Sequence, residues 1–417
     1  MKVLTRLAVI STALAFALVL GCGGKSSTEP KTDPAAAAGE VDAGNTALAN
    51  GDYAAANEHF KTAIAKDPSN AQAQFGAAVT EVYLLQDDPE LQSLAGQFQL
   101  FQPGALPVSH GRLARRVAFS QRVESLRSSV VGPYTPGRMG AAVVRTLALA
   151  GNEPDSISEI QAIVRTKVMP KLQYAEDRLN AAEAAADFRM FIDPAVTGLP
   201  DTLEIDKTEL YLLDSVINGV QGWLGILTAY NFDVENSDFE HVNAESLLAP
   251  GTTWATLHPY GHLALAQAKN DFETVKARFD AAAAYLANES DDQANDLIPQ
   301  EWLSTQDYAD LADGIDQMYA ALTGPILVPA RDANDQEFDL QVDLGRFLVP
   351  GIDDLKKALP NHTFENGELK PVEPITFSTE SGYGGPTVYG IFPDMTDARW
   401  QQLTGLTGPP PTLRATR

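Results

Sequence analysis

The stretch GNTALANGDYAAANEHFKTAIAKDPSN, residues 44–70, decides the fold of this chain. Its second half places Ala56, Phe60 and Ala63 at positions i, i+4 and i+7, which is the spacing of one face of an α-helix. Gly51 marks a turn before that face, and Pro68 follows it. Because proline cannot continue a helix and disfavours the helical conformation of the preceding residue, the second helix ends there. The stretch therefore predicts two helices joined by a tight turn.

In its spacing this hairpin resembles a tetratricopeptide repeat (TPR). Gly44 stands where the first helix needs a small residue against its partner, and Gly51 with Tyr53 forms the turn. The resemblance implies that Ala56, Phe60 and Ala63 are the inner stripe of the second helix and that Pro68 closes it; these residues are structural.

Residues 71–83 look like the first helix of a second repeat, and no clear copy follows. Since about three repeats are needed for an independent solenoid, we expect the hairpin either to pack on later helices or to continue into degenerate repeats. The alternative is that two helices merely share the spacing.

Further along, residues 92–323 are helical in pattern with loops between. We expect helices at 112–128 and 141–150, and a long one at 156–190 with a kink at Pro170. Asp206 followed by Glu209 is a capping-box pattern that opens a helix through Tyr230. This helix is apolar nearly all round, which predicts a central position. Another helix follows His262.

The central helix carries glycine at positions 219, 222 and 225. Each glycine costs up to about 1 kcal/mol relative to alanine in a helix, so an offsetting gain is expected. Close approach of a neighbouring helix is the simplest gain. A bound hydrophobic ligand in a pocket near Trp223 and Tyr230 is the sharper alternative.

The composition changes after about residue 325. Residues 338–344 alternate apolar and polar side chains, as a half-buried strand does. Short helices are expected at 353–359 and 396–403, and short strands around 375–377 and 387–389. The fold class predicted for the chain is mainly α. TPR-like hairpins (40–105) continue into an all-α bundle or solenoid (106–325), and a small α+β region (326–417) follows.

The amino-terminal segment has the pattern of an export signal. Lys2 and Arg6 precede an apolar run over residues 7–20, and Val-Leu-Gly-Cys at 19–22 resembles the lipobox of bacterial lipoproteins. A membrane-spanning helix needs about 20 apolar residues, whereas a signal peptide uses about 7–15. The resemblance implies cleavage of residues 1–21 between Gly21 and Cys22 and a lipid on the Cys22 thiol.

Residues 22–39 are small, polar and broken by proline, which predicts a flexible tether to the membrane. Gly23, directly after the lipidated position, is not the aspartate that resembles an inner-membrane retention signal. The expected location is therefore the cell envelope, with the periplasmic face of the outer membrane favoured.

The charge excludes one class of partner. The net charge of the 417-residue chain is −25, and loss of Lys2 and Arg6 with the signal peptide makes it more negative. Such a surface repels phosphate backbones, so nucleic acid is not expected as a partner. With Cys22 as its one cysteine, the chain has no intrachain disulfide.

No motif predicts catalysis, a cofactor or a metal. His258 and His262 are four residues apart, but the intervening Pro259 and Gly261 disfavour the regular helix that a shared zinc ion requires. Acidic segments at 233–241 and 332–337 lack the spacing of a calcium-binding loop. A nucleophile elbow of the form Gly-x-Ser-x-Gly is absent.

The sequence therefore predicts a non-enzymatic lipoprotein that binds a protein or peptide through a TPR-like surface. The first alternative is a ligand-binding accessory of solute or lipid uptake, with its cavity near Trp223 and Tyr230. A hydrolase on an unfamiliar helical scaffold is the second alternative.

Overall fold

The computed structural model describes residues 32–85, 157–192, 202–233, 244–249, 251–290, 295–332, 336–365 and 368–404. In these ranges the protein is mainly helical, with small two-stranded antiparallel sheets. The signal peptide, Cys22 and the helices expected at 112–128 and 141–150 lie outside the described residues.

The helices, in chain order, are α2 (Pro34–Ala49), α3 (Tyr53–Lys66), α4 (Ala71–Leu84), α9 (Ile157–Ile163), the π-helical turn η3 (Val164–Val168), α10 (Met169–Glu183), α12 (Lys207–Ala229), α13 (Ala244–Leu248), α14 (Gly261–Asn288), η5 (Gln300–Ser304), α15 (Gln306–Thr323), η6 (Phe347–Gly351), η7 (Leu355–Ala358) and α16 (Asp397–Thr404). The strands pair as β1 (Met190–Ile192) with β2 (Leu203–Ile205), β3 (Tyr230–Asn231) with β4 (Thr256–Leu257), β5 (Ile326–Arg331) with β6 (Glu337–Val342), and β7 (His362–Glu365) with β8 (Glu368–Pro371).

The predicted hairpin is present as α2 and α3, and α4 matches the next expected helix. All three helices meet at Phe60, whose side chain is fully buried. A Cβ added at Gly44 in α2 would lie 2.9 Å from the Phe60 ring, and one added at Gly76 in α4 would lie 2.5 Å from it. Glycine at these two positions therefore lets α2 and α4 approach the same ring.

The prediction of a flexible tether through residue 39 is wrong at its end, because α2 already begins at Pro34. The Asp33 side chain accepts a hydrogen bond of 3.0 Å from the Ala36 backbone N–H, which caps the helix. Proline is favourable in the first turn, and the alanines that follow are the strongest helix formers. Ala37 is already fully buried, so the helix is held by packing as well.

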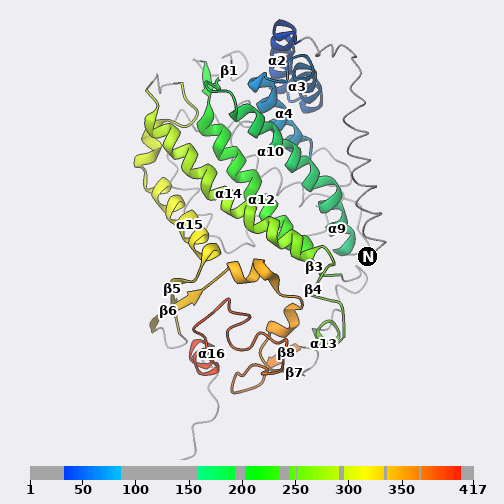
Figure 1. Ribbon diagram of the computed structural model, residues 1–417, viewed down its shortest axis with the longest axis vertical. Helices are drawn as coiled ribbons and strands as arrows, with labels where there is room; N and C mark the ends of the chain where they lie inside the picture. Colours follow the sequence, from blue (N-terminus) through cyan, green and yellow to red (C-terminus); the bar gives the residue numbers. More distant parts are fainter. Residues whose placement is uncertain are drawn as a thin grey trace, which may run out of the picture.

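The helices pack in series, each mainly on the next. Figure 1 shows α2, α3 and α4 at one end, then α10, α12 and α14 side by side, with α15 along α14. One hydrophobic cluster runs from Ala37 in α2 to Leu224 in α12. The regions predicted separately as 40–105 and 106–325 thus share a core, because α10 packs directly on α4.

The central position predicted for α12 agrees with its packing between α10 and α14. Its capping box is formed: the Thr208 backbone N–H donates to the Asp206 carboxylate (2.6 Å), and the Asp206 N–H donates to Glu209 (2.9 Å). Among the described helices, α12 is long and apolar enough to cross a bilayer. Of its most apolar 18-residue segment, 56% is buried within the protein, as in the core helix of a soluble domain.

The glycines of α12 face α14, as close helix packing predicts. A Cβ on Gly222 would lie 2.9 Å from the Phe272 ring, and one on Gly225 would lie 3.2 Å from Ala268. A Cβ on Gly219 would make an ordinary contact of 3.6 Å with Val275. The three positions therefore differ in how much room they leave.

This difference predicts opposite effects of two alanine substitutions on one helix. Gly222→Ala should destabilise the protein by about 1–3 kcal/mol, because Phe272 is buried and the added methyl overpacks the interface. Gly219→Ala should stabilise it by up to about 1 kcal/mol, because alanine favours the helix and meets no obstacle. Urea unfolding of both variants measures the two changes; equal effects would contradict the packing described for Gly222.

After α15 the chain forms the six-residue strands β5 and β6, which pair with each other. The strand expected at 338–344 is β6, and the short terminal helix is α16. The strands expected around 375–377 and 387–389 are not formed. Val388 and Tyr389 have positive φ angles of 49° and 59° in a turn. The strands that follow β6 in the chain are β7 and β8, which pair with each other before residue 375. The long helix expected at 156–190 is divided instead. The π-helical turn η3 joins α9 to α10, Pro170 stands in the first turn of α10, and α10 ends at Glu183.

Candidate functional site

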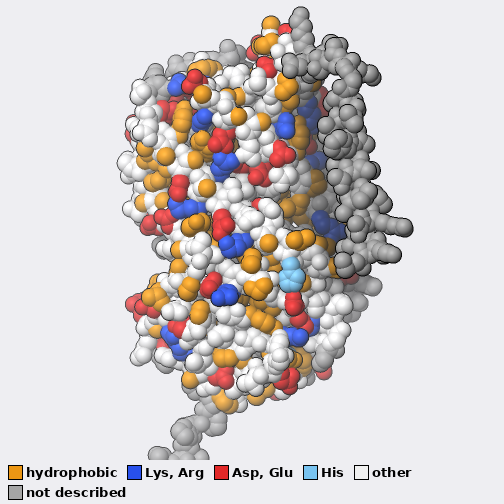
Figure 2. Space-filling model, viewed as in Figure 1, with side chains coloured by type: hydrophobic (Ala, Val, Ile, Leu, Met, Phe, Trp, Pro, Cys, Tyr) orange, Lys and Arg blue, Asp and Glu red, His pale blue; other side chains and the backbone are white. Residues whose placement is uncertain are grey.

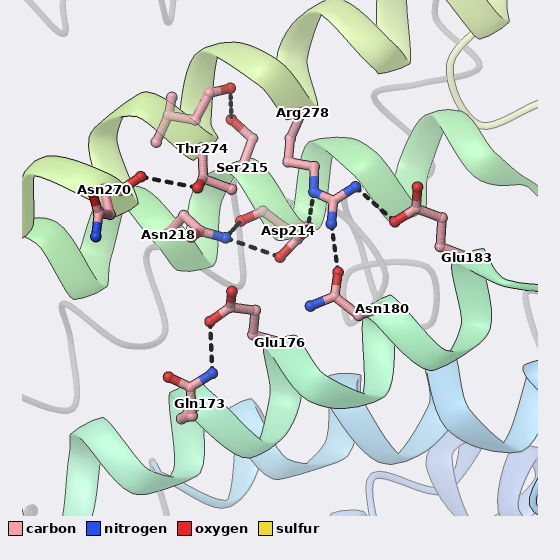
Figure 3. A network of polar contacts seen from close by, with 11 residues as sticks. Gln173, Glu176, Asn180, Glu183, Asp214, Ser215, Asn218, Asn270, Thr274 and Arg278 are labelled. Carbon is pink, nitrogen blue, oxygen red and sulfur yellow. Dashed lines mark hydrogen bonds and ion pairs between the residues drawn. The ribbon is translucent and has the colours of Figure 1, made fainter. Parts of the chain in front are cut away.

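A network of polar contacts forms a seam between α10, α12 and α14 (Figure 3). We define the seam by Glu176, Asn180 and Glu183 of α10, Asp214, Asn218 and Gln221 of α12, and Asp271 and Arg278 of α14. On each helix these residues recur three, four or seven positions apart, so they share one face. The packing in series turns the three faces toward one another.

Arg278 holds the upper end of the seam together. Its Nε lies 2.6 Å from Asp214 Oδ2, and one of its terminal nitrogens lies 2.6 Å from Glu183 Oε2; the other donates to Asn180. Asn218 donates to Asp214 Oδ1 over 3.0 Å. Figure 3 shows the guanidinium between all three helices. Arg278 therefore joins α10 and α14 across α12.

Asp214 needs this cation because its side chain is only 1% exposed. Burial raises the pKa of Asp214 to about 7, and Arg278 acts in the opposite direction by favouring the carboxylate. The neighbouring carboxyl groups of Glu176 and Glu183 raise the pKa further. Without the guanidinium, the buried Asp214 carboxylate would have no positive charge to compensate it.

The lower end of the seam has carboxyl and amide groups instead. Gln267 donates to Asp271 Oδ1 over 2.7 Å, and Gln173 donates to Glu176 Oε2 over 3.0 Å. The Gln221 amide, on α12, favours the charged form of Glu176 and so acts to lower the pKa of that carboxyl group. Among the described residues, two buried oxygens here have no hydrogen-bond partner: Asp271 Oδ2 and Gln221 Oε1.

Negative charge on the carboxyl groups at the lower end, those of Asp271 and Glu176, is unfavourable. Burial raises the pKa of Asp271 to about 6, and the nearby Glu176 carboxyl group raises it as well. The pKa of Glu176 is also raised, mainly by burial. The two carboxyl groups therefore oppose each other's ionisation.

This arrangement predicts a pH-dependent effect of Asp271→Asn. Because the pKa of Asp271 is raised in the folded protein from 3.8 to about 6, the stability from its protonated form is present below pH 3.8 and is lost as the pH rises through about 6. Asparagine does not ionise, so the Asp271→Asn variant escapes this loss. The free energy of unfolding of the variant, relative to that of the wild type, should therefore rise by up to about 3 kcal/mol between acidic pH and pH 8. Urea unfolding across this range measures the gain, with the exposed Asp177→Asn as control. A pH-independent difference would contradict the raised pKa.

The structure does not bring Trp223 and Tyr230 together, although the sequence suggested a shared pocket. Trp223 is 67% exposed, and its ring packs edge-on against Phe272 at 5.5 Å. Tyr230 is fully buried between Phe232 and Phe347. An exposed indole on the surface and a buried phenol in the core lie in different environments.

The residues singled out by the TPR resemblance lie in and around the α2–α4 core. Gly44, Ala56, Phe60 and Ala63 are buried. Gly51 has a φ of 75° in the turn, the left-handed region that glycine adopts most easily. The Tyr53 ring stacks on Tyr83 at 4.7 Å, and Pro68 follows α3. Four of these residues thus lie in the core, and the others lie in or beside the turns that flank α3.

Of the two histidines, His262 links α14 to the carboxyl-terminal region. His262 Nδ1 lies 2.7 Å from the Pro350 carbonyl oxygen, and its Nε2 lies 3.0 Å from Asp353. His258 stacks on Tyr260. In the part of the chain that the structure describes, no three His, Cys, Asp or Glu side chains form a group that could hold a metal ion. Residues 234–241 and 333–335 of the two acidic segments lie outside that part.

The seam is not predicted from the sequence, because its α12 members are spread through an apolar helix. The sequence does contain a signal for it: Asp214, Asn218 and Gln221 are polar at i, i+4 and i+7, which places them on one face.

No known family model, curated protein or solved structure matches this chain.

Proposed function

We propose that this protein is a lipid-anchored cell-envelope scaffold that binds a protein or peptide without catalysing a reaction. The observation that carries the proposal is the serial packing of α2, α3, α4, α10, α12 and α14 (Figure 1). Helices that each contact mainly their neighbours build an extended surface instead of a closed bundle, and such surfaces bind segments of other proteins.

The anchor would hold this surface close to the membrane. After cleavage, residues 22–33 would separate the lipidated Cys22 from the first turn of α2. A chain of that length spans about 40 Å when fully extended. Partners would then be met within a thin layer at the membrane, with the outer membrane's periplasmic face as the favoured place.

The side chains that converge in the seam also suit a binding role. They are carboxyl, amide and guanidinium groups that contact one another, and none of the defined seam residues is a Ser, Cys or His nucleophile. Carboxyl, amide and guanidinium groups form hydrogen bonds and ion pairs with polar and charged groups of another molecule.

The test is purification of the tagged full-length protein from its own membranes in mild detergent, followed by native mass spectrometry. A stoichiometric protein or peptide partner, together with a diacylglyceryl-modified Cys22, is expected. Cys22→Ser is the matched control and should remain uncleaved and without lipid. A bare monomer that carries a small molecule would overturn the scaffold proposal in favour of ligand uptake.

A further inference from the structure

The helix α12 buries its polar side and exposes an apolar one. Asp214, Asn218 and Gln221 on the polar side are buried. On the other side, Trp223 is 67% exposed and Leu227 is 42% exposed. Trp223 follows Asp214 by about two and a half helical turns, so the two side chains point in opposite directions from the helix axis. The usual arrangement of an amphipathic helix is thus reversed in α12.

The apolar side of α12 is a continuous stripe. Val216, Val220, Trp223 and Leu227 recur at i, i+4, i+7 and i+11, which places them on one face. The two valines are half-buried. Because a stripe of this kind normally packs into the core, its exposure marks a surface for another molecule.

The helix α15 carries a second apolar stripe that is only partly covered. Leu311, Ile315 and Met318 recur at i, i+4 and i+7. Leu311 is 46% exposed, and the other two side chains are half-buried. Of the 18 residues of α15, the buried ones are Ala321 and Leu322. Packing on α14 therefore leaves much of the apolar side of α15 open.

The two stripes lie on either side of α14, as Figure 1 shows. One hydrophobic cluster joins Leu212 of α12 to Ile315 of α15. A second cluster contains Phe272 of α14 and has Met318 of α15 packed against it. The Trp223 ring lies edge-on to Phe272 at 5.5 Å. Since the stripes meet the same clusters, we define them together as the α12–α15 face: Val216, Val220, Trp223, Leu227, Leu311, Ile315 and Met318.

The charge beside this face is negative. Four aspartates recur every three residues along α15, which contains no Lys or Arg: Asp307, Asp310, Asp313 and Asp316. Asp307 precedes Leu311 by four residues, so it borders the face. Asp316 lies 3.0 Å from Lys276 of α14 and is already paired. In Figure 2, hydrophobic and acidic side chains lie side by side along the left of the upper part, where Figure 1 places α15.

Charge decides which occupant fits the α12–α15 face. The aspartates would repel a surface of anionic lipid. They would also repel a second copy of the chain, because a symmetric contact brings the same residues of both copies together. A helix with one apolar side and Lys or Arg along its borders fits both the apolar stripes and the aspartates.

We propose that the α12–α15 face binds an amphipathic helix of a partner protein that carries basic side chains along its apolar side. Its apolar residues would pack on Trp223 and Leu311, and its Lys or Arg side chains would lie beside Asp307 and Asp310. That the partner is a protein rests on the scaffold function proposed above; its shape and charge rest on the face.

The first test measures binding of a labelled model helix to the purified full-length protein by fluorescence anisotropy. The probe is a leucine–lysine peptide of about 18 residues, the length of α15, with its leucines on one helical side. It should bind at least about tenfold more tightly than a leucine–glutamate peptide of the same pattern or a scrambled leucine–lysine peptide. Equal affinity for either control peptide would overturn the proposal.

Two double variants locate the binding. Trp223→Ser/Leu311→Ser should weaken binding of the leucine–lysine peptide at least about tenfold, because it removes the exposed apolar contacts. Asp307→Asn/Asp310→Asn leaves every apolar side chain in place and should weaken binding at least about threefold. Leu263→Ser replaces a leucine that is 77% exposed elsewhere on α14 and should bind as the wild type does. Unchanged affinity in either double variant would contradict the assignment. Self-association, or binding to phosphatidylglycerol vesicles, that Trp223→Ser/Leu311→Ser abolishes would assign the face to a second copy or to lipid instead.

The second test separates this inference from the scaffold function. Partner recovery from membranes is compared between the wild type and Trp223→Ser/Leu311→Ser. A loss of at least about tenfold in affinity for the recovered partner supports docking on the α12–α15 face. Equal recovery overturns docking there and leaves the scaffold intact. Absence of any partner from the wild type overturns the scaffold, while the peptide result decides by itself whether the face binds a basic amphipathic helix.

Discussion

Replacement of Arg278 by methionine is expected to destabilise the protein by about 3–5 kcal/mol, because it leaves the Asp214 carboxylate buried without its cation. Asp214 is 1% exposed, so water cannot replace the guanidinium. The same change removes the contacts of Arg278 with Glu183 and Asn180, and thereby the link between α14 and α10. Urea unfolding monitored by circular dichroism at pH 8 measures the loss.

The double variant Asp214→Asn/Arg278→Met is the matched control. Since it removes the buried charge together with its partner, it should recover most of the stability that Arg278→Met loses. Two independent, additive losses would contradict the account of Asp214 and Arg278 as a coupled pair. Lysine at position 278 should restore only part of the stability, because one ammonium group cannot reproduce the forked contacts of the guanidinium.

The parts of the fold that the sequence predicts well depend on neighbours in the chain. The capping box at Asp206 and Glu209 opens α12 as expected, and the turn at Gly51 separates α2 from α3. Both are local signals, in which a side chain satisfies backbone groups a few residues away. The start of α2 lies inside the predicted tether because proline interrupts a helix interior but is favourable in the first turn, where Pro34 stands.

The parts that the sequence does not predict depend on contacts between distant segments. That α10 packs on α4 cannot be read from either helix, since the single buried stripe of α10 does not specify its partner and α4 is buried nearly all round. Trp223 shows the same limit: in a helix that is apolar nearly all round, periodicity does not tell which side meets a neighbour, and this indole remains 67% exposed. The seam likewise depends on which helices are neighbours in space, which none of their sequences specifies.

The turn at Val388 and Tyr389 has a different cause. Apolar, β-branched and aromatic residues favoured a strand there, but Gly384, Gly385 and Pro386 precede them. The Tyr389 backbone N–H donates to the Gly384 carbonyl over 3.1 Å, which closes a turn over this segment. Local turn chemistry thus outweighed strand propensity.

Phe60→Ala is expected to cost about 3–5 kcal/mol, because it removes the ring around which α2, α3 and α4 pack and leaves a cavity. Phe60 is fully buried, and the close approach of Gly44 and Gly76 to its ring limits how far the helices can relax. The exposed Thr62→Ala on the same helix should change stability by less than about 0.5 kcal/mol and serves as the control.

The pattern of unfolding in Phe60→Ala also tests the shared core. Because one hydrophobic cluster joins α2–α4 to α10 and α12, the loss should lower hydrogen-exchange protection in α10 as well as in the first three helices. Protection lost only in α2–α4 would show instead that these helices unfold as an independent unit.

Gly76→Ala provides a second probe of the contact with Phe60. Its Cβ would lie 2.5 Å from the Phe60 ring, so the substitution should destabilise the wild type. The same substitution should be tolerated beside Phe60→Leu, because the smaller leucine side chain makes room for the added methyl group.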